Sequence, residues 1–387
     1  MQKFPLFLLF FGHVWVDASQ GILPVALVKL KDAFGLTYFQ VGAVTAVLNF
    51  TSSVIQPLFG FVADRYRLGW FVPWGIVWTA LSMGLIGLAP SYVLILFLVG
   101  FAGLGTAAFH PRAMMAVSLV SGNRRGFGTA VFVTGGNLGF ALGPVVGSFL
   151  VLGFGLHATL GLVGPGLIIA LAILLYPADY LKRENTSRRD AAESPEDEKV
   201  SIPWIPLILV CLIVTLRSWV YISFITYLPM FLQGQGVEIG KASLMLTLFL
   251  AGGAAAGLYG GHLSDRIGRV KVIVVSMLLY PLFMSMAILS QGPWLWILIG
   301  ASGAALLASY SVTIVLAQEL LPRNLGLASG LILGLGFGTG GLGVAVSGLI
   351  ADAVGLYKAV WVLALMPVFG SILAAFVRTP GRSVTPR

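Results

Sequence analysis

The stretch Gly60-Phe-Val-Ala-Asp64-Arg65-Tyr-Arg67 decides the fold, because the chain contains its pattern twice. The pattern returns as Gly261-His-Leu-Ser-Asp265-Arg266-Ile-Gly-Arg269, and the offset is 201 residues for both the glycine and the acid. Three further glycines, at positions 135, 139 and 147, have counterparts at 336, 340 and 348 with the same offset. A constant offset between separated motifs indicates a chain built from two related halves.

Composition places this chain in a membrane. Hydrophobic residues make up 58% of the 387 residues and charged residues 10%, against about 25% charged in a soluble domain. The first apolar run lacks a basic region beyond Lys3 and a small-residue cleavage site, so we do not expect a cleavable signal peptide. The single Cys211 excludes an intramolecular disulfide. These features exclude a soluble enzyme with one membrane anchor.

Twelve apolar runs have the length that a helix needs to cross about 30 Å of hydrocarbon. Their periodicity is helical and does not alternate every second residue, which argues against a transmembrane barrel. We therefore predict an all-α membrane protein with twelve transmembrane helices in two pseudo-symmetric six-helix bundles. The approximate spans are residues 4–28, 38–62, 70–90, 92–118, 127–153, 157–178, 204–232, 241–262, 271–290, 293–320, 325–350 and 357–377.

One polar segment, KRENTSRRDAAESPEDEK at 182–199, separates the first six runs from the last six. It has the composition of a solvated linker. We predict an N-terminal six-helix bundle at 1–181, a cytoplasmic linker at 182–202 and a C-terminal six-helix bundle at 203–387. Repeated halves of this kind are typical of a transporter whose substrate site lies between them.

The Lys and Arg residues predict how the chain is oriented. Seventeen of the 23 lie at loop ends on the side that holds both termini and the linker, and four lie on the other side. Because basic residues concentrate in cytoplasmic loops, we expect a multi-pass protein of the cell (inner) membrane with both termini cytoplasmic. This distribution accounts for the net charge of +9, so we expect the lipid bilayer as a partner and no nucleic acid. We also expect a monomer.

The first apolar run carries polar residues on one helical face. In Gly12–Pro24 these include His13, Asp17 and Gln20. If the helix enters the bilayer near Phe4, His13 lies about 13 Å deep and Asp17 about 20 Å deep. Ionisable groups at that depth usually face a protein interior or a wet cavity. We predict that Asp17 carries a coupling proton and that His13 either relays it or orients Asp17. The alternative is a short N-terminal helix with a solvated face.

Arg217 lies inside the seventh run, near the repeat equivalent of His13, and has no acid nearby in its own helix. A membrane-embedded arginine needs a partner, which we expect to be Asp17 across the interface or an anionic substrate. A purely structural pairing with an acid or a carbonyl is the alternative. Tyr221 shares the helical face of Arg217.

The fourth and fifth runs add further polar residues. His110 and Arg112 are about 200° apart around a straight helix, so they share no face unless Pro111 kinks it. We expect at least one to face the cavity, His110 rather than Arg112; a structural histidine is the alternative. Asn137 either hydrogen-bonds substrate or packs near the kink at Pro144. The predicted substrate-binding residues are Arg217, His110, Arg112, Tyr221, Asn137 and Gln20.

The repeated loop motif combines a close helix approach at its glycine with charged residues at a helix end. Such charges can bridge neighbouring helix ends, holding a gate closed in one state and releasing it in another. Glu319, four residues before Arg323, is expected to form a gate salt bridge rather than a substrate contact. The alternative is positive-inside charge with a tight turn. The predicted gating residues are Asp64, Arg65, Arg67, Asp265, Arg266, Arg269 and Glu319.

Glycines recur every four residues in the fifth run, together with a proline. They predict a flat face and a kink, and the eighth run offers a matching small face. Plain close packing accounts for part of this pattern. The predicted helix-packing residues are Gly139, Gly143, Pro144, Gly147, Gly253 and Gly257.

The loop motif, G-x-x-x-D-R-x-R in the first copy and G-x-x-x-D-R-x-x-R in the second, resembles the loop motif of the major facilitator superfamily. After Arg67 the first copy continues with Leu68 and Gly69, so it lacks the usual final basic residue. The segment from Gly139 is similar to the antiporter motif of that superfamily, G-x-x-x-G-P-x-x-G-G, with Ser148 in place of the last glycine. This resemblance implies export in exchange for another solute.

A narrower resemblance, to the fosmidomycin-resistance family of drug exporters, spans nearly the whole chain. It rests on His13-x-x-x-Asp17, Phe109-His110-Pro111, Gly135-Gly136-Asn137 to Gly143-Pro144, Ala317-Gln318-Glu319-Leu-Leu-Pro322 through Gly326 and Ser329-Gly330, and Gly340-Gly341-Leu-Gly343 to Ala351-Asp352. Arg112 stands where that family usually has Glu. The resemblance implies proton-driven export of a small, anionic, antibiotic-like compound.

Three functions are compatible with these observations. The first is a proton-coupled antiporter that exports a small anionic or antibiotic-like compound by alternating access. The second is a proton symporter that imports an organic or phosphonate-like anion with the same residues. The third is a membrane enzyme or scaffold, for which the sequence shows no G-x-S-x-G, H-E-x-x-H or G-x-x-x-x-G-K-[ST] motif. We predict the first, with no enzymatic activity, cofactor or metal, and with a small-molecule substrate and protons as partners.

Overall fold

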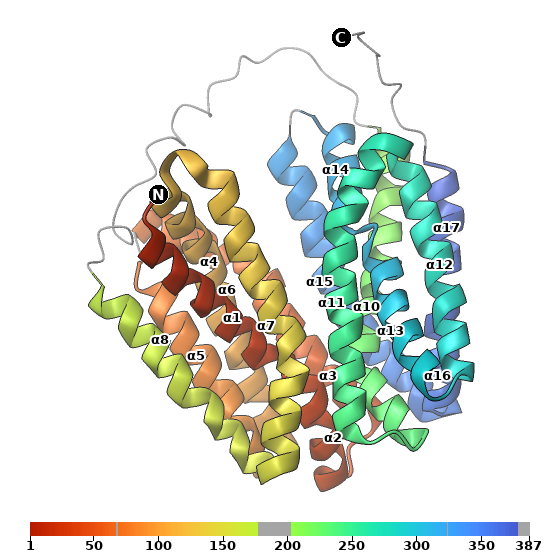
Figure 1. Cartoon of the computed structure of the whole chain (residues 1–387), viewed down its shortest axis with the longest axis horizontal. Coiled ribbons are helices and arrows are strands. Elements are labelled where there is room, and N and C mark those ends of the chain that lie inside the picture. Colours follow the sequence, from red (N-terminus) through yellow and green to blue (C-terminus); the bar gives the residue numbers. More distant parts are fainter. Residues whose placement is uncertain (67–68, 177–202, 323, 378–387) are drawn as a thin grey trace.

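Helices make up all the regular structure in the described part of this computed structural model, residues 1–66, 69–176, 203–322 and 324–377. Figure 1 shows them as two bundles, one from each half of the chain. The N-terminal half contains α1 (Lys3–Gly21), α2 (Leu23–Phe34), α3 (Tyr38–Asn49), α4 (Gln56–Tyr66), α5 (Phe71–Leu85), α6 (Tyr92–Ser121), α7 (Arg125–Phe154) and α8 (Val163–Leu175). The C-terminal half contains α10 (Trp204–Gly234), α11 (Ile239–Ile267), α12 (Arg269–Leu289), α13 (Pro293–Leu307), α14 (Tyr310–Leu320), α15 (Leu325–Val354), α16 (Leu356–Leu365) and α17 (Pro367–Ala375).

Eleven helical segments of the described residues are long and apolar enough to cross a membrane. One of them, Tyr92–Phe154, has 63 residues, whereas one crossing needs about 20. It contains α6 and α7, joined by a short 3-10 turn at Gly122–Arg124, so it provides two crossings. The predicted all-α fold, with twelve crossings in two sets of six, is therefore confirmed.

Several of the long spans depart from a regular α-helix or contain a proline, which removes a backbone donor from the helix. The first span breaks between α1 and α2, where Pro24 lies in the first turn of α2. The second span passes through a π-helix at Phe50–Val54 before α4. Pro111 and Pro144 lie inside α6 and α7. The predicted spans match these helices to within several residues, but each of the first two spans consists of more than one helix.

The glycines of α7 bring its backbone against that of α1. A Cβ atom on Gly139 would lie 2.9 Å from Val14 Cα, and one on Gly21 of α1 would lie 3.0 Å from Gly143 Cα. A Cβ on Gly147 would lie 3.0 Å from the Ile22 side chain, just past the end of α1. These distances are shorter than ordinary contacts, so larger residues would push the two helices apart.

The face of α11 that carries Gly253 and Gly257 packs within the C-terminal half. A Cβ on Gly253 would lie 3.2 Å from the Gly303 carbonyl of α13, and one on Gly257 would lie 3.5 Å from the Leu307 carbonyl. The glycine faces of α7 and α11 therefore do not meet, because each is used for packing within its half. The two helices instead touch where Thr247 Oγ1 donates a hydrogen bond to the Ala141 carbonyl (2.8 Å).

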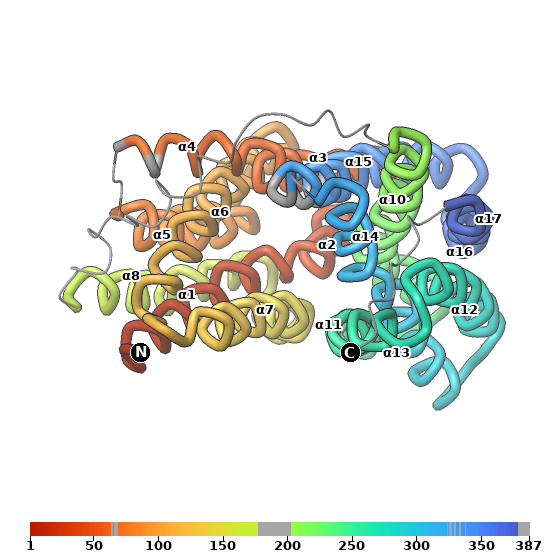
Figure 2. The backbone as a smooth tube through the Cα atoms, turned by 90° about the horizontal axis from the view of Figure 1, so that it is seen from above, coloured from red at the N-terminus to blue at the C-terminus, as the bar shows by residue number. Residues whose placement is uncertain are grey.

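At one end of the molecule the two halves are closed against each other. There α3 packs along α15, and α7 packs along α11, as Figure 2 shows from above. Tyr227 Oη of α10 lies 2.9 Å from the Tyr38 carbonyl of α3, and Thr226 Oγ1 lies 3.2 Å from Thr45 Oγ1. Asp352, near the end of α15, accepts hydrogen bonds from the backbone N–H groups of Tyr38 (2.8 Å) and Phe39 (2.9 Å). We call these four contacts the closing contacts.

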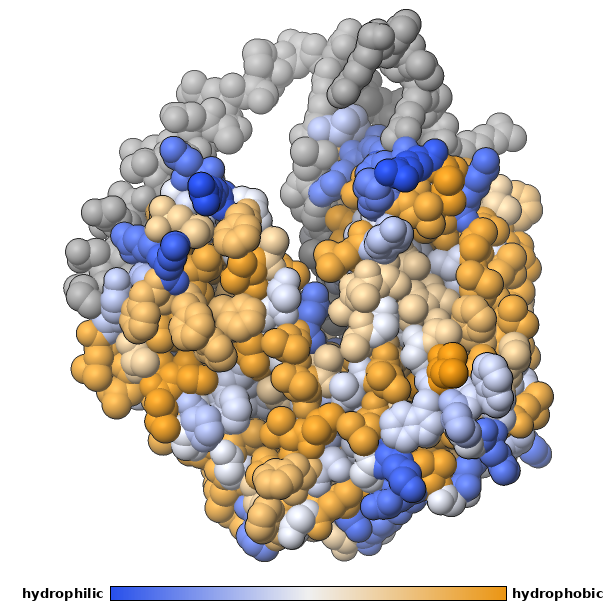
Figure 3. Space-filling view, viewed as in Figure 1, coloured by the Kyte–Doolittle hydropathy of each residue, from blue (hydrophilic) through white to orange (hydrophobic). Residues whose placement is uncertain are grey.

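At the other end, where the N-terminus lies, the halves separate. Figure 3 shows a hollow between them that opens toward this end. Hydrophobic side chains cover most of the visible outer surface around the middle of the molecule, and hydrophilic ones gather at both ends. This surface matches a bilayer, with an apolar band between two wet interfaces.

Candidate transport site

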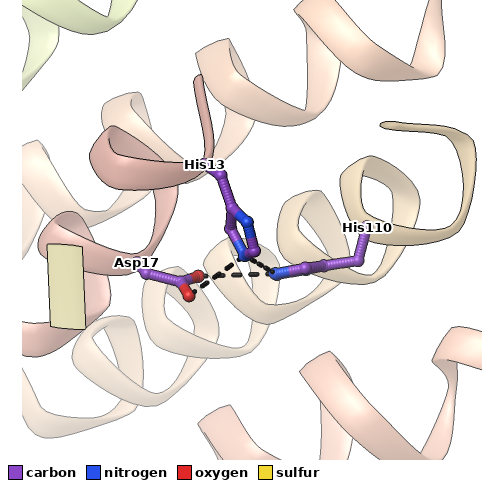
Figure 4. Close-up of side chains that lie close together, drawn as sticks. All are labelled: His13, Asp17 and His110. Carbon is purple, nitrogen blue, oxygen red and sulfur yellow. Dashed lines mark hydrogen bonds and ion pairs between the residues drawn. The ribbon is translucent and has the colours of Figure 1, made fainter. Parts of the chain in front are cut away.

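The polar face of α1 brings three ionisable side chains together. His13 and Asp17 lie one turn apart on α1, and His110 reaches them from α6 (Figure 4). His13 Nε2 lies 3.3 Å from Asp17 Oδ2, and His110 Nε2 lies 3.5 Å from Asp17 Oδ1. The two histidine Nε2 atoms lie 3.0 Å apart. We call these three residues the proton cluster, after the role that we propose for them below.

Backbone carbonyls fix the orientation of both imidazole rings. His13 Nδ1 donates to the Phe132 carbonyl of α7 (2.7 Å), and His110 Nδ1 donates to the Thr106 carbonyl of α6 (2.9 Å). A carbonyl oxygen can only accept, so each Nδ1 carries a hydrogen. Each ring therefore turns its Nε2 atom toward Asp17.

Gly136 of α7 provides the space in which the proton cluster sits. A Cβ atom at this position would overlap His13 Nε2 and would lie 2.7 Å from Asp17 Oδ2. Phe132, one turn earlier on α7, stacks its ring against that of His13 with centroids 4.0 Å apart. Helix α7 thus supplies the carbonyl, the ring contact and the gap that position His13.

The proton cluster is partly open to solvent-accessible space. The side chains of His110 and Asp17 are 22% and 18% exposed, whereas that of His13 is 8% exposed. Asn137, next to Gly136 on α7, is exposed, and Gln20 on α1 is half-buried. Of the predicted substrate-binding residues His110, Asn137 and Gln20, His110 has a ring nitrogen 3.5 Å from an Asp17 oxygen.

His110 and Arg112 point to different surroundings, as their separation on α6 predicts. His110 contacts the proton cluster, while Arg112 is 4% exposed and its NH1 lies 2.9 Å from the sulfur of Met115. The structure thus places His110, and not Arg112, beside Asp17. The substrate-binding role of either residue stays a prediction.

Arg217 is buried inside the C-terminal half. It is 1% exposed, and its NH1 donates to the Ser309 carbonyl (3.0 Å) and to Thr313 Oγ1 (2.9 Å). Its guanidinium carbon lies 5.1 Å from the centre of the Tyr310 ring. Among the described residues no carboxylate forms an ion pair with Arg217, so the expected Arg217–Asp17 pair is absent from this conformation.

Tyr221 lies one turn after Arg217 on α10 and is half-buried. Its ring is nearly parallel to that of Phe249 on α11, with centroids 6.2 Å apart. Helix α10 thus presents an aromatic residue beside its buried cation.

One of the two predicted gating clusters is described by the structure. Arg269 at the start of α12 pairs with Asp265 (2.6 Å) and with Glu319 of α14 (3.1 Å), and also donates to Ser264 Oγ. This network joins the ends of three helices of the C-terminal half, whereas Arg266 is exposed. In the first copy of the motif Arg65 is exposed, and the Asp64 side chain and Arg67 lie outside the described residues. The gating role of all these residues stays a prediction.

The proton cluster also contains atoms that could hold a divalent metal ion. Its two ring nitrogens and its carboxylate oxygen lie within 4.8 Å of one another. Two of these atoms already touch at 3.0 Å, so a hydrogen fits between them without any change in geometry. The three residues can therefore hold a hydrogen bond between the rings as they stand, and their role as a proton site stays a prediction.

The sequence did not reveal the neutral groups that contact the proton cluster and Arg217. Thr106, Phe132, Ser309 and Thr313 contribute backbone carbonyls or a hydroxyl, and no pattern of residue types marks those positions. The positioning role of Gly136 was missed as well. The signal was present, because two adjacent glycines occur where the four-residue glycine pattern requires only one.

Comparison with known protein families gives a match over nearly the whole chain. A family model described as Major Facilitator Superfamily matches residues 9–243 and 236–387. The chain is 31% identical over 367 residues to the "Fosmidomycin resistance protein" of Escherichia coli (strain K12), and the match covers 93% of this chain and 89% of that protein. It is 32% identical over 371 residues to the "Uncharacterized MFS-type transporter YfnC" of Bacillus subtilis (strain 168), covering 92% and 89%.

Solved structures share the arrangement of helices. One is titled "Crystal Structure of A Bacterial Homolog to Human Lysosomal Transporter, Spinster, in Inward-facing And Occupied Conformation". It superposes with a TM-score of 0.82, covers 97% of this chain and 96% of that chain, and is 15% identical in sequence. At that identity the match concerns the fold alone.

Proposed function

Because this chain belongs to the major facilitator superfamily and is a transporter rather than an enzyme, we propose that it exchanges protons for a small anionic compound. The compound leaves the cell as protons enter, by alternating access between two halves that rock around a central site. Asp17 carries the coupling proton, and His13 and His110 lie beside it.

The observation that carries this proposal is the proton cluster itself. A carboxylate between two imidazoles in the middle of a transmembrane helix is costly to bury. Apolar residues would stabilise the fold at this position at a lower cost in free energy. Histidine changes its charge near neutral pH, where a proton gradient acts. Partial exposure of Asp17 and His110 supports proton access from the hollow between the halves.

The direction of transport is supported by α7. Its Gly139, Gly143, Pro144 and Gly147 resemble the antiporter motif of the superfamily, and the glycines pack α7 closely on α1. A relative that covers nearly the whole chain is named for fosmidomycin resistance, which suits export. The alternative, a symporter that imports an organic or phosphonate-like anion, uses the same residues in the opposite direction.

The charge of the substrate is suggested by Arg217. Among the described residues, the buried Arg217 guanidinium hydrogen-bonds only neutral groups, which leaves its positive charge uncompensated there. An anionic group, such as a phosphonate or carboxylate, would compensate it. Tyr221, Asn137 and Gln20 are proposed as further substrate contacts around the hollow.

The excess of basic residues around both termini supports a cytoplasmic position for the open end of the hollow. In this proposal the structure represents the state that takes up substrate from the cytoplasm in the inner membrane. The network around Arg269 tightens or loosens as the halves move.

Transport in reconstituted vesicles tests the proposal, with fosmidomycin as the probe. An acidic lumen should drive fosmidomycin into vesicles that contain the wild-type protein, because protons leave as the compound enters. Acid outside should drive uptake instead if the protein is a symporter. A wild-type flux that is the same with and without a pH gradient would contradict proton coupling altogether.

Asp17→Asn should lower the gradient-driven flux to the level of protein-free vesicles, because an amide cannot release a proton. Asp32→Asn is the matched control, since Asp32 is exposed at the end of α2. Uphill transport by Asp17→Asn at the wild-type rate would show that another residue carries the proton.

A further inference from the structure

We infer that the proton cluster holds one proton shared between His13 and His110, so that the two imidazoles and Asp17 together carry no net charge. This inference rests on the proposed proton coupling and concerns a second proton, which the two histidines hold while Asp17 is ionised and able to take up the coupling proton. It makes His110 a proton-holding residue, although the sequence had suggested a substrate contact.

The hydrogen bonds to the backbone limit where protons can be. Both Nδ1 atoms already carry a hydrogen, which they donate to the carbonyls of Phe132 and Thr106. In a neutral imidazole with a hydrogen on Nδ1, the Nε2 atom is a bare acceptor. Any hydrogen on Nε2 of His13 or His110 is therefore an additional proton that makes the ring an imidazolium.

The contacts among the three residues then select one protonation state. With no additional proton, two bare Nε2 atoms would face each other at 3.0 Å, and both would face a carboxylate. With two additional protons, two cationic rings would lie with their N–H groups 3.0 Å apart and would share the single carboxylate of Asp17. With one, an N–H of one ring donates to the nitrogen of the other, at an ordinary hydrogen-bond distance.

The net charge of the proton cluster also favours the state with one additional proton. Zero, one or two additional protons give the cluster a net charge of −1, 0 or +1, and only the neutral state avoids burying a net charge in a low-dielectric interior. Gly136, the residue of α7 that lies against His13 and Asp17, is neutral. The buried cations on α6 and α10 make contacts of their own: Arg112 NH1 lies against Met115, and Arg217 is bound to Ser309 and Thr313.

Gly136 is a positioning residue for the shared proton. A methyl group at this position would occupy the space of His13 Nε2 and press on Asp17 Oδ2. Gly136→Ala should therefore separate the rings while leaving all three titratable groups in the chain. Gly153→Ala is the matched control, because Gly153 lies on the same helix and a Cβ there meets nothing within 4 Å.

Nitrogen-15 NMR of histidine in the full-length protein tests the inference directly. The other two histidines, His157 and His262, are exposed and are replaced by glutamine, so that only His13 and His110 are observed. A shared proton should give a strongly downfield N–H signal with scalar coupling to both Nε2 atoms. Both rings should also change together when the one additional proton is removed at high pH.

Three variants and one control sharpen this measurement. Asp17→Asn should alter the shared signal, and His110→Gln and Gly136→Ala should abolish it, while Gly153→Ala should keep it. Unfolding is checked independently by circular dichroism and by elution as a single species, and His110→Gln keeps the test valid if Gly136→Ala does not fold. Two Nε2 atoms that titrate separately, without coupling, in the wild-type protein would overturn the inference.

The outcome is distinguishable from failure of the proposed function. Gradient-driven flux that depends on Asp17, together with independent histidine signals, would refute the shared proton and leave proton coupling intact. A shared signal in a protein whose flux ignores the pH gradient would leave the shared proton intact and refute the coupling.

Discussion

Arg217 puts a full positive charge inside a bundle, where the described residues offer it a carbonyl, a hydroxyl and an aromatic face. Each hydrogen bond to a charged group stabilises a protein by about 1.5–3 kcal/mol. The desolvation of an ion costs several kcal/mol, which is of the same order as the gain from the two bonds of Arg217. At the scale of this residue, a ligand of opposite charge would add an attraction that the neutral groups do not supply.

Arg217→Gln should weaken the binding of fosmidomycin by at least about tenfold, because the loss of a charge-assisted contact exceeds about 1.4 kcal/mol. The measurement is the rise in melting temperature of the purified protein on adding fosmidomycin. Arg266→Gln is the control, since Arg266 is exposed at the end of α11. An equal rise in Arg217→Gln and wild type would place the anion elsewhere.

The contacts of some single residues could be predicted from the sequence, and those of others could not. His13 and Asp17 follow from the period of one helix, and their contact needed only a spacing of four residues. The position of His110 beside them depends on how α6 packs against α1, which no local pattern encodes. The same holds for Arg217, whose partners are backbone and hydroxyl groups of the α13–α14 segment.

At the scale of elements, the start of α3 is capped from the other half of the molecule. The carboxylate of Asp352 accepts two N–H groups that the helix itself leaves unpaired, and Thr37 with Gln40 completes a capping box. A negative charge at a helix N-terminus also meets the positive end of the helix dipole. This cap exists only while the two halves are closed at this end.

Asp352→Ala should therefore favour the state that is open at this end. Loss of a cap typically costs about 1 kcal/mol, which changes the ratio of the two states about fivefold. Spin labels at Ala33→Cys and Val354→Cys, in a Cys211→Ser background, report the distance between the halves. Asp32→Ala should leave the distance distribution unchanged, and an unchanged distribution in Asp352→Ala would show that the cap does not hold this end closed.

Element boundaries followed from apolar length, but the partners of each helix did not. The glycine faces of α7 and α11 suggested contact between the two helices, whereas each face packs within its own half. Small residues allow a close approach without specifying which helix approaches. The break between α1 and α2 could be anticipated from Pro24, because proline disrupts the preceding turn.

At the scale of the whole molecule, the repeat of 201 residues and the apolar runs predicted two six-helix halves. Which end is open could not be predicted, because both states of an alternating-access protein have one sequence and differ by only a few kcal/mol. Positions 137 and 141 on α7 mark where the halves meet in this state. Asn137 is exposed, and Ala141, one turn later, is buried at the contact with Thr247.

Asn137→Cys should react with a small hydrophilic maleimide in a Cys211→Ser background, and Ala141→Cys should not. Fosmidomycin should slow the reaction at position 137 if this part of the hollow holds the substrate. The rate of labelling followed by mass spectrometry provides the measurement. Equal reactivity at both positions would mean that the halves do not close between these two turns.

The closing contacts of Tyr227 and Thr226 have a property that favours reversible motion. Besides the acceptors in the other half, Tyr227 Oη lies 2.9 Å from the Val344 carbonyl, and Thr226 Oγ1 lies 2.9 Å from the Ile222 carbonyl, both within the C-terminal half. A hydroxyl donates one hydrogen at a time, so separation of the halves transfers each bond to the acceptor in the C-terminal half instead of losing it. The two hydroxyls join the halves in the closed state, and each still has an acceptor when the halves separate. No buried donor is therefore left unsatisfied in the open state, which keeps the two states close in free energy.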